Sequence, residues 1–547
     1  MRRKAYRFSV CVLVFSAMSF SCTKPGPEEG PDNNPADKIE VSLEEGMDYC
    51  GVVTDTDGNP VSGVTVSDGF NCTVTDSYGI YQLKKGSDFS AMVNISIPSE
   101  YEVPIEDGLP CFWKKIEKGQ PRYDFILRKS AVPENEFYLF TLADPQCQNN
   151  TRHTVRFSNE TVPDLKSSAQ KYGAQASVYA ITLGDIGYNT SDKEYNIGSA
   201  VFSNMKRAMH VDKTSVPIFQ VMGNHDNNLI AENKSYSVEM DIEMEKYFTK
   251  FFGPVNYSFN RGNAHIIAMD DILCTNPGSS YNCGFRDDQV EWLKQDLANV
   301  PKDKMIILCV HIPFYYSSSG QNVRTVLNLI SGYAESHVMS GHTHRSINTP
   351  NTCNSGIYEH THGAVCGAWW WSTVNTDGTP NGYGVYKIEG SHVAWWKYKG
   401  VGLEDDNQIR MYRGNTAFMT GQAKTYYFAK TTASDLWANI WNWDSSWTVD
   451  VYEDGEKTGS MSRYTNDNDS TGDARDAWAV GYHVGVTGRG ATNYDKKNVK
   501  HLLHFTLKNP QAQVEIRATD RFGNVYSQKE FTDGTSKYWP IAPGDSY

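Results

Sequence analysis

Long hydrophobic runs are scarce in this chain of 547 residues. A helix that crosses a bilayer needs about 20 consecutive apolar residues. The run from Phe8 to Phe20 is too short for that, and no later segment reaches the required length. The run follows a basic start formed by Arg2, Arg3 and Lys4, and a short apolar run behind such a start is typical of a secretory signal. We therefore expect export and a soluble body.

An excess of basic residues is also absent. The chain carries 51 Lys and Arg against 64 Asp and Glu, a net charge of −13. Because binding to a phosphate backbone needs a basic face, we expect no nucleic acid as a bulk partner. A small phosphorylated substrate remains compatible with this charge, since bound metal ions reverse the local sign.

Cysteine use fits export. Nine of the eleven cysteines follow Cys22. The segment Ser19-Phe20-Ser21-Cys22 resembles a bacterial lipoprotein cleavage site, although a Leu-like residue is usual where Ser19 stands. We expect a lipid on Cys22 that anchors the chain to a bacterial membrane, on the periplasmic side or at the cell surface. Ordinary signal cleavage with an unmodified cysteine is the alternative.

Two pairs of cysteines are close in sequence, Cys274 with Cys283 and Cys353 with Cys366. An oxidising compartment permits disulfides at both places, but pairing cannot be deduced from sequence. Free buried thiols are equally compatible with these positions.

The sequence divides into five segments, with no internal repeat. A signal peptide (residues 1–22) precedes a tether rich in Pro, Gly and acidic residues (23–44). Residues 45–130 contain short alternating stretches punctuated by turns such as Asp57-Gly58-Asn59-Pro60, and resemble a carboxypeptidase-regulatory-like β-sandwich. Residues 131–400 alternate strand and helix candidates, which indicates an α/β domain. Residues 401–547 return to a β-rich pattern.

Within the α/β segment, apolar runs predict buried strands and longer periodic segments predict helices. The strand candidates are Phe137–Leu142, Val178–Leu183, Pro217–Met222, His265–Met269, Met305–Val310 and Val338–Met339. The helix candidates are Val162–Tyr172, Ile197–Met209, Asp288–Asn299 and Val323–Tyr333. In the last segment the clearest strands are Thr425–Phe428, Trp447–Tyr452, Leu502–Leu507 and Val514–Ala518. Its tryptophans, Trp437, Trp441, Trp443 and Trp447, form either a core or a sugar-binding platform.

Five polar motifs each follow one of the strand candidates. They are Asp144-Pro145-Gln146, Gly184-Asp185, Gly223-Asn224-His225-Asp226, His311 and Gly341-His342-Thr343-His344. Ligands of open α/β sheets lie beyond the carboxyl ends of the strands, so we expect these motifs to cluster at one rim. Their oxygen and nitrogen donors suit Mn, Fe or Zn, and the glycines allow the sharp turns that bring ligands together.

The order and spacing of these motifs resemble the calcineurin-like metallophosphoesterase family. The resemblance covers about half of the chain, and implies a β-sandwich core covered by helices, flanked by the two β-rich accessory domains. It also implies two divalent or trivalent metal ions: Mn, Fe or Zn, with Mg as a further option. Asp144 and His344 would hold the first metal, Asn224, His311 and His342 the second, and Asp185 would bridge both.

The same resemblance implies hydrolysis of a phosphomonoester or phosphodiester by a hydroxide that bridges the metals. His225 would protonate the leaving oxygen or stabilise the developing charge, and Asp226 would orient His225. The first family motif usually ends in histidine, where this chain has Gln146. Its amide oxygen is either a weaker ligand of the first metal or only a hydrogen-bonding neighbour.

Substrate contacts are predicted from position alone. Arg152 follows the first motif and is either a partner for a phosphate or a solvated surface arginine. His360 and His362 precede the run Trp369-Trp370-Trp371, and this segment is either a substrate wall or a buried aromatic strand with structural histidines. The expected substrate is a phosphorylated small molecule, lipid or glycan. The alternative function is a surface glycan-binding lipoprotein with a degenerate phosphoesterase core, for which Gln146 is the one sign of decay.

Overall fold

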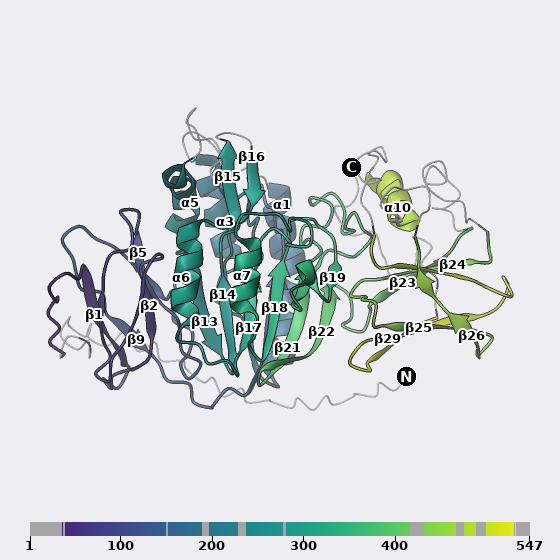
Figure 1. Ribbon diagram of the computed structural model, residues 1–547. Coiled ribbons are helices and arrows are strands. Elements are labelled where there is room, and N and C mark those ends of the chain that lie inside the picture. Colours follow the sequence, from purple (N-terminus) through teal and green to yellow (C-terminus); the bar gives the residue numbers. More distant parts are fainter. Residues whose placement is uncertain are drawn as a thin grey trace, which may run out of the picture.

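The computed structural model describes residues 36, 39–148, 151–188, 196–227, 237–276, 280–415, 432–465, 475–487, 499–529 and 531. The N-terminal β domain, the α/β core and the C-terminal β domain follow one another across the molecule (Figure 1). Cys22, the signal segment and the strand candidate Thr425–Phe428 lie outside the described residues. Among the helices that are described, none has both the length and the apolarity to cross a membrane.

One sheet of the core has five strands in the order β12 (Ile218–Phe219), β11 (Ser177–Thr182), β10 (Glu136–Leu142), β21 (Gly382–Glu389) and β22 (His392–Gly400). The first three strands are parallel, whereas β21 and β22 form an antiparallel hairpin on β10. Strand β10 is buried along almost its whole length, which explains its largely apolar sequence.

The second sheet has six strands in the order β13 (Tyr257–Arg261), β14 (Ala264–Ala268), β17 (Met305–Cys309), β18 (Glu335–Ser340), β20 (Tyr358–Thr361) and β19 (Ile347–Thr349). Strands β14, β17, β18 and β20 run parallel, and β13 and β19 are antiparallel at the two edges. A separate hairpin, β15 (Ile272–Asn276) with β16 (Ser280–Cys283), extends from this half of the core.

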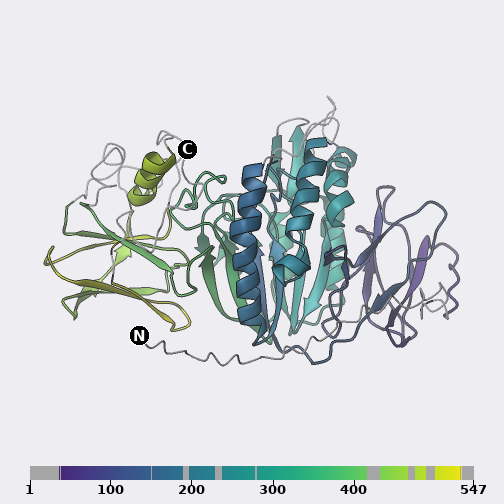
Figure 2. The same cartoon turned by 180° about the vertical axis from the view of Figure 1, so that it is seen from behind.

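The two sheets face each other and bury a shared apolar layer that includes Leu139, Ile181, Ile266 and Ile307. The outer face of the five-stranded sheet is covered by α2 (Val162–Gly173), α3 (Asn196–Ala208) and α5 (Val238–Phe252), best seen in Figure 2. The other sheet is covered by α6 (Asp287–Leu297) and α7 (Val323–Ile330). The predicted β-sandwich core covered by helices is confirmed.

Several helices differ from the sequence prediction. The helical segment that contains α2 begins at Thr151, well before the predicted start at Val162. Helix α1 (Thr151–Arg156) and a π-helical turn, η2 (Phe157–Thr161), lead into α2 without a break. Helix α5 was not predicted, although Ser237 caps its start and Gly253 ends it. Helix α7 ends at Ile330, three residues before the predicted end at Tyr333.

The N-terminal domain is a small β-sandwich. One sheet has the order β4 (Ile80–Leu83), β1 (Tyr49–Asp55) and β9 (Phe125–Leu127). The other is β3 (Cys72–Val74), β2 (Thr65–Ser67), β5 (Met92–Ile95) and β8 (Trp113–Lys115). Hydrogen bonds from Trp292 Nε1 to Ser67 Oγ (3.1 Å) and between Ser258 Oγ and Ser96 Oγ (2.9 Å) attach it to the core.

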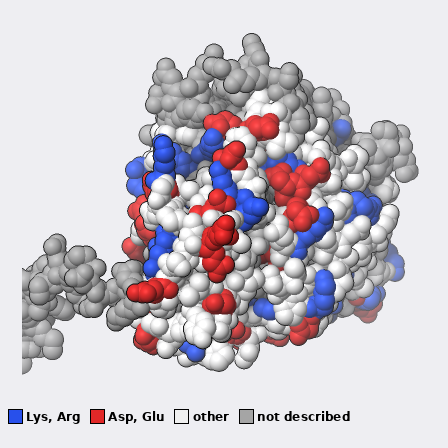
Figure 3. All heavy atoms as spheres, turned by 60° about the vertical axis from the view of Figure 1, so that its left-hand side comes forward, with Lys and Arg blue, Asp and Glu red and all other residues white. Residues whose placement is uncertain are grey.

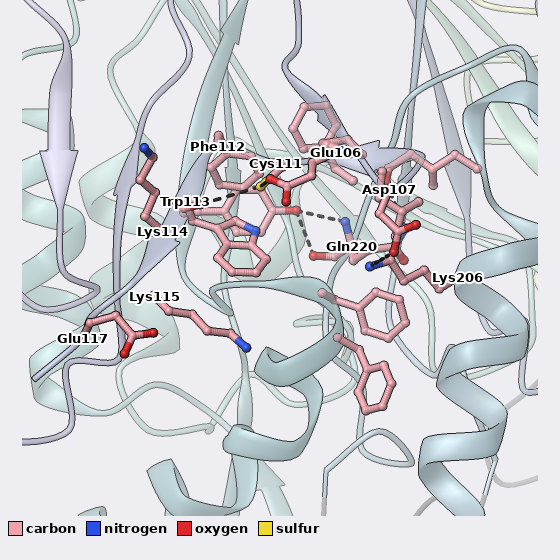
Figure 4. Close-up of a pocket in the computed structure, with 17 residues that line it drawn as sticks. Glu106, Asp107, Cys111, Phe112, Trp113, Lys114, Lys115, Glu117, Lys206 and Gln220 are labelled. Atoms are coloured by element: carbon pink, nitrogen blue, oxygen red, sulfur yellow. Dashed lines mark hydrogen bonds and ion pairs between the residues drawn. The ribbon is translucent and has the colours of Figure 1, made fainter. Parts of the chain in front are cut away.

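Between this domain and the core lies a cavity of about 440 Å³ lined by Trp113, Lys115, Gln220 and Phe252, among others (Figure 4). The short ribbon β6 (Ile105–Glu106) with β7 (Leu109–Pro110) forms part of its wall. At one edge Asp107 pairs with Lys206 of α3 at 2.8 Å. No residue of the five predicted motifs lines this cavity. Acidic and basic side chains are interspersed over the face of the molecule shown in Figure 3.

The C-terminal domain pairs two four-stranded sheets and carries the unpredicted helix α10 (Ala477–Thr487). The sheets are β23 (Ile409–Arg413), β24 (Asp435–Ile440), β28 (Leu502–Thr506) and β27 (Ser462–Arg463), and β26 (Glu456–Ser460), β25 (Thr448–Glu453), β29 (Val514–Thr519) and β30 (Val525–Gln528). Trp437 and Trp441 are buried in one apolar cluster, and Trp447 is buried in a second, against which Trp443 packs. These rings form a core rather than an exposed sugar platform.

The nine cysteines after Cys22 are free. Cys274 and Cys283 stand on opposite strands of the β15–β16 hairpin, but their Cα partners are Tyr281 and Ile272, so the two thiols are out of register with each other. Of the two alternatives, disulfides and free thiols, this structure has free thiols.

Candidate metal centre

The five motifs meet at the carboxyl ends of strands from both sheets. Asp144 follows β10, Asp185 follows β11 and Asn224 comes shortly after β12, all on the five-stranded sheet. His311 follows β17 and His342 follows β18 on the six-stranded sheet. The motifs that the sequence places at one rim thus come from two facing sheets, and the site lies between the carboxyl ends of their strands.

Four of the side chains form one tight group. Asn224 Oδ1 lies 2.9 Å from Nδ1 of His342 and 3.0 Å from Nε2 of His311. The same Nε2 of His311 lies 3.3 Å from Oδ2 of Asp185. Asp185, His311 and His342 each offer one possible metal-ligand atom, and these three atoms lie within 4.8 Å of one another. Such a set of oxygen and nitrogen donors can surround a single cation.

The remaining predicted ligands, Asp144, Gln146 and His344, are taken together as a second group. Oδ1 of Asp144 lies 3.3 Å from Nε2 of His344, and Nε2 of Gln146 donates a 2.8 Å hydrogen bond to Oδ2 of Asp185. Asp185 contacts residues of both groups, His311 of the first and Gln146 of the second. Oδ2 of Asp144 also reaches the first group, by accepting a 2.9 Å hydrogen bond from the backbone N–H of His342. The two groups are therefore adjacent, and Asp185 lies where a ligand shared by two metals would be expected.

Two buried oxygens in the second group accept no hydrogen bond: Oε1 of Gln146, and Oδ1 of Asp144, whose 3.3 Å contact with Nε2 of His344 is not a hydrogen bond. Buried acceptors without a hydrogen bond are costly and rare in folded proteins. A cation beside them would remove that cost, so the residues present fit a metal here. The same observation favours the amide oxygen of Gln146 as a metal ligand rather than only a hydrogen-bonding neighbour of the site. Ligation by Gln146 remains a prediction.

Glycines before three of these residues cannot be replaced without a collision. A Cβ on Gly184 would lie 2.4 Å from Nδ1 of His311, and one on Gly223 would lie 2.2 Å from the backbone nitrogen of Asp185. A Cβ on Gly341 would lie 2.7 Å from Oδ2 of Asp144. The glycines therefore allow the loops of the two sheets to approach each other.

The backbone at the site is strained. Positive φ angles occur at Asp144 (49°), Gln146 (40°), Asp185 (53°), His342 (65°) and His344 (53°). A non-glycine residue in this region costs about 1 kcal/mol or more, and such residues concentrate at functional sites. His342 and His344 are two residues apart, and these left-handed turns explain how both side chains reach the site.

The tautomer of His311 is fixed by a hydrogen bond on the ring nitrogen that faces away from the site. Its Nδ1 donates a 2.8 Å hydrogen bond to the carbonyl of Leu183, so Nε2 faces the site. This carbonyl contact on the far nitrogen is the usual way in which a metal-binding histidine is oriented.

The carboxylates create a negative field that attracts cations. Burial opposes protonation of His311, but the charge of Asp185 outweighs it and raises the pKa of His311 to about 10. Asp185 shows the reverse effect: burial opposes its ionisation, yet the charges of His311 and His225 hold its pKa well below the usual range. Burial, followed by the charge of His311, lowers the pKa of His342 to about 4, which leaves that ring neutral and able to bind a metal.

His225 lies half-buried at the edge of the group, with its ring 4.5 Å from that of Tyr188. Its backbone N–H donates to Oδ1 of Asp185 at 2.8 Å. Asp226 is fully buried and accepts hydrogen bonds from the backbone N–H groups of Ile186, Gly187 and Gly223. Asp226 therefore braces two site loops against each other, and its predicted role of orienting His225 stays a prediction.

His362 does not fit the substrate contact that we predicted. It is buried below the site, with Nδ1 3.0 Å from the carbonyl of Ser340 and Nε2 2.8 Å from the hydroxyl of Tyr386. Both nitrogens are engaged, so no donor or acceptor is left for a substrate. Arg152 is half-buried on α1, and its contact with a phosphate stays a prediction.

The tryptophan run at residues 369–371 is a turn and not the buried strand that was one of the two interpretations. Trp370 donates a 2.8 Å hydrogen bond from Nε1 to the carbonyl of Pro145, and the ring of Trp369 lies 4.9 Å from that of His344. Spacing could not reveal Trp370 as a support for the first motif, because the contact joins residues 225 positions apart.

Three models of one protein family match most of the chain. Residues 158–346 match "Calcineurin-like phosphoesterase", residues 47–130 match "N terminal of Calcineurin-like phosphoesterase", and residues 359–526 match "C terminal of Calcineurin-like phosphoesterase". The central match contains all the motif residues from Asp185 to His344.

Individual relatives are more distant. Purple acid phosphatase 15 of Arabidopsis thaliana is 27% identical over 148 residues, which are 24% of this chain and 25% of that protein. The chain thus matches about a quarter of the length of this curated relative. Among solved structures, purple acid phosphatase PPD1 from yellow lupin is 14% identical with a TM-score of 0.32, covering 62% of this chain and 67% of that one. PhoD is 11% identical with a TM-score of 0.32, covering 69% and 83%.

Proposed function

The chain belongs to the calcineurin-like phosphoesterase family, and on this basis we propose that it hydrolyses a phosphomonoester or a phosphodiester outside the cytoplasm. The family implies a dinuclear metal site. The single observation that best supports the proposal is the position of Asp185, which contacts His311 of one group and Gln146 of the other.

The two groups would hold one metal each. Asp144, Gln146 and His344 would hold the first, and Asn224, His311 and His342 the second, with Asp185 shared. When bound, the metals would activate water and neutralise charge on the phosphoryl oxygens. The metals themselves remain to be identified among Mn, Fe, Zn and Mg, because the mixed donor set accommodates all of them.

The protein's own contribution is orientation. The Leu183 carbonyl holds His311 in one tautomer, and Asp226 ties the loop that carries Asp185 to the loop that carries Asn224. Ligands held in this way need little rearrangement during the reaction, which is how a preorganised site lowers an electrostatic barrier.

His225 is our candidate for the proton donor. Its ring is half-buried, so it can face both the site and a bound ester. A proton delivered to the leaving oxygen as the P–O bond breaks would prevent the release of an alkoxide.

We also propose that the chain is exported and anchored through Cys22, with residues 45–130 and 401–547 as accessory domains on the catalytic domain of residues 131–400. Replacing Cys22 by Ala should move the protein from the membrane fraction to the soluble fraction of its host. Retention in the membrane would contradict a lipid on Cys22.

Activity is tested with the full chain, purified in detergent and loaded with Mn, Zn, Fe or Mg. Hydrolysis of 4-nitrophenyl phosphate and of bis(4-nitrophenyl) phosphate is measured in parallel with metal content. Metal-dependent turnover of either ester supports the proposal, and the preferred ester assigns the subclass. A folded chain that holds two metals but turns over neither these esters nor a panel of phosphorylated sugars, nucleotides and lipids would contradict it.

A further inference from the structure

Three aromatic side chains each contact a different histidine of the site. The ring of Tyr188 lies 4.5 Å from that of His225, and the ring of Trp369 lies 4.9 Å from that of His344. Tyr281 meets the ring of His342 edge to face, at 6.1 Å and 83°. All three aromatic side chains are partly exposed, so part of each remains available to a ligand. We refer to Tyr188, Tyr281 and Trp369 as the aromatic trio.

The position of Trp369 is set by its neighbour. Trp370 is buried and is held at three atoms: Nε1 donates to Pro145, the backbone nitrogen donates to the carbonyl of Cys366, and its own carbonyl accepts from Nη1 of Arg156. Both Trp369 (φ 50°) and Trp370 (φ 63°) have a left-handed backbone.

A bulky residue adopts this conformation only where the surroundings enforce it. The turn thus places the half-exposed ring of Trp369 beside a predicted metal ligand. Because that placement precedes any ligand, Trp369 would bind a flat group without first losing conformational freedom.

Tyr281 faces the same space from the hairpin β15–β16. Its ring meets that of His342 edge to face, so part of the Tyr281 side chain borders a predicted metal ligand. The members of the trio therefore come from three different loops or hairpins, and each borders a different histidine of the site.

We propose that the trio is the subsite for the leaving group, and that the preferred substrates are phosphoesters whose leaving group carries an aromatic ring, stacked on Trp369. This inference rests on the proposed hydrolase function. Stacked and edge-to-face aromatic contacts add roughly 0.5–1.5 kcal/mol beyond the burial of area. Aliphatic or sugar leaving groups lack a π face and would gain less from the trio.

The test compares benzyl phosphate with cyclohexylmethyl phosphate, using the full chain loaded with metal. Both leaving groups are primary alcohols of similar acidity, so the comparison isolates the aromatic face from leaving-group chemistry. We expect kcat/KM to be about 5-fold higher for the benzyl ester. Trp369→Ala should bring the ratio to about 1, whereas Trp369→Phe, which keeps a ring, should preserve most of it. The control is Trp395→Ala on β22, which packs against Tyr138 and Tyr172 and should retain the wild-type ratio.

Equal kcat/KM values for the two esters in the wild-type protein would overturn the inference and leave the hydrolase function intact. If neither ester is hydrolysed, calorimetry with benzylphosphonate and cyclohexylmethylphosphonate decides the inference separately. Tighter binding of the benzyl compound that is lost in Trp369→Ala would support the subsite even then, and equal or absent binding would overturn it.

Discussion

Nε2 of Gln146 donates a 2.8 Å hydrogen bond to Oδ2 of Asp185, while Oε1 of Gln146 is buried without a hydrogen bond. The amide thus links the two halves of the site and presents one unsatisfied acceptor. This arrangement explains how a glutamine can stand where the family pattern has histidine. For the proposed pair of metals it predicts a weaker first position, because an amide oxygen is a poorer ligand than an imidazole for most of the candidate metals.

Two replacements of Gln146 should therefore change the number of metals bound per chain in opposite directions. Gln146→His should raise occupancy of the first site at limiting Zn by about 10-fold or more, and Gln146→Met, of similar size but without the amide, should empty it. Metals per chain are measured by mass spectrometry after dialysis against a fixed free-metal concentration. Identical stoichiometry in all three proteins would remove Gln146 from the ligand set.

His225 should affect the chemical step without affecting metal binding. In His225→Ala we expect kcat to fall by roughly 10²- to 10⁴-fold for an alkyl phosphoester, because the leaving alkoxide needs a proton. The loss should be much smaller for a nitrophenyl ester, whose leaving group is stable as an anion. His392→Ala, at a histidine that is 68% exposed, is the control. Equal losses for both esters would argue against a proton donor.

The close approach of the loops can be tested with two glycines that share a positive φ. Gly184→Ala would place a Cβ 2.4 Å from Nδ1 of His311, whereas Gly402, with φ +75°, has no atom within 4 Å of its added Cβ. Both changes cost about 1–2 kcal/mol of backbone strain, but only Gly184→Ala displaces His311. We expect that variant alone to lose the second metal and at least about 10-fold in activity. Equal behaviour of the two variants would mean that the collision is relieved elsewhere.

Part of the loss of folding stability at acid pH should arise at Glu335, which begins β18 at the end of the strand away from His342. Glu335 accepts hydrogen bonds from His337 and His392, and although burial opposes its ionisation, these contacts lower its pKa from 4.5 to about 2. A lowered pKa stabilises the folded state above the unfolded value, so this contribution is present above pH 4.5 and lost as the pH falls toward 2.

The stabilisation is about 2 kcal/mol, below the full linkage value because the carboxylate is 30% exposed. The metal-free wild-type protein should have a higher urea midpoint than Glu335→Gln at pH 6, and the difference should shrink steadily below pH 4.5. The control is Glu102→Gln, at a carboxylate that is 54% exposed. A difference that does not depend on pH would assign the effect to packing.

Much of the site followed from the sequence because its signals are local. Strands β10, β11 and β17 are largely apolar, and each is followed within two residues by a polar motif, so the rim could be predicted before the fold was known. The glycines before Asp185, Asn224 and His342 indicated close approach, and the collisions at their Cβ positions bear this out.

What could not be predicted depends on contacts distant in sequence. No local pattern says that β10 and β17 belong to different sheets, because both are buried parallel strands. The role of Trp370 depends on a bond to Pro145, and the burial of His362 depends on Tyr386 from a later strand. Helix α5 was missed despite its capping residues, because the buried acidic side chains of Asp241 and Glu245 interrupt its apolar face.

The central claim is that one chain holds two metals bridged by Asp185. The most direct measurement is anomalous diffraction from crystals of the metal-loaded protein, collected above and below the absorption edge of the bound metal. The account predicts two peaks, one between Asp144, Gln146 and His344 and one between Asn224, His311 and His342, with the Asp185 carboxylate between them. A single peak, or peaks that Asp185 does not contact, would contradict it.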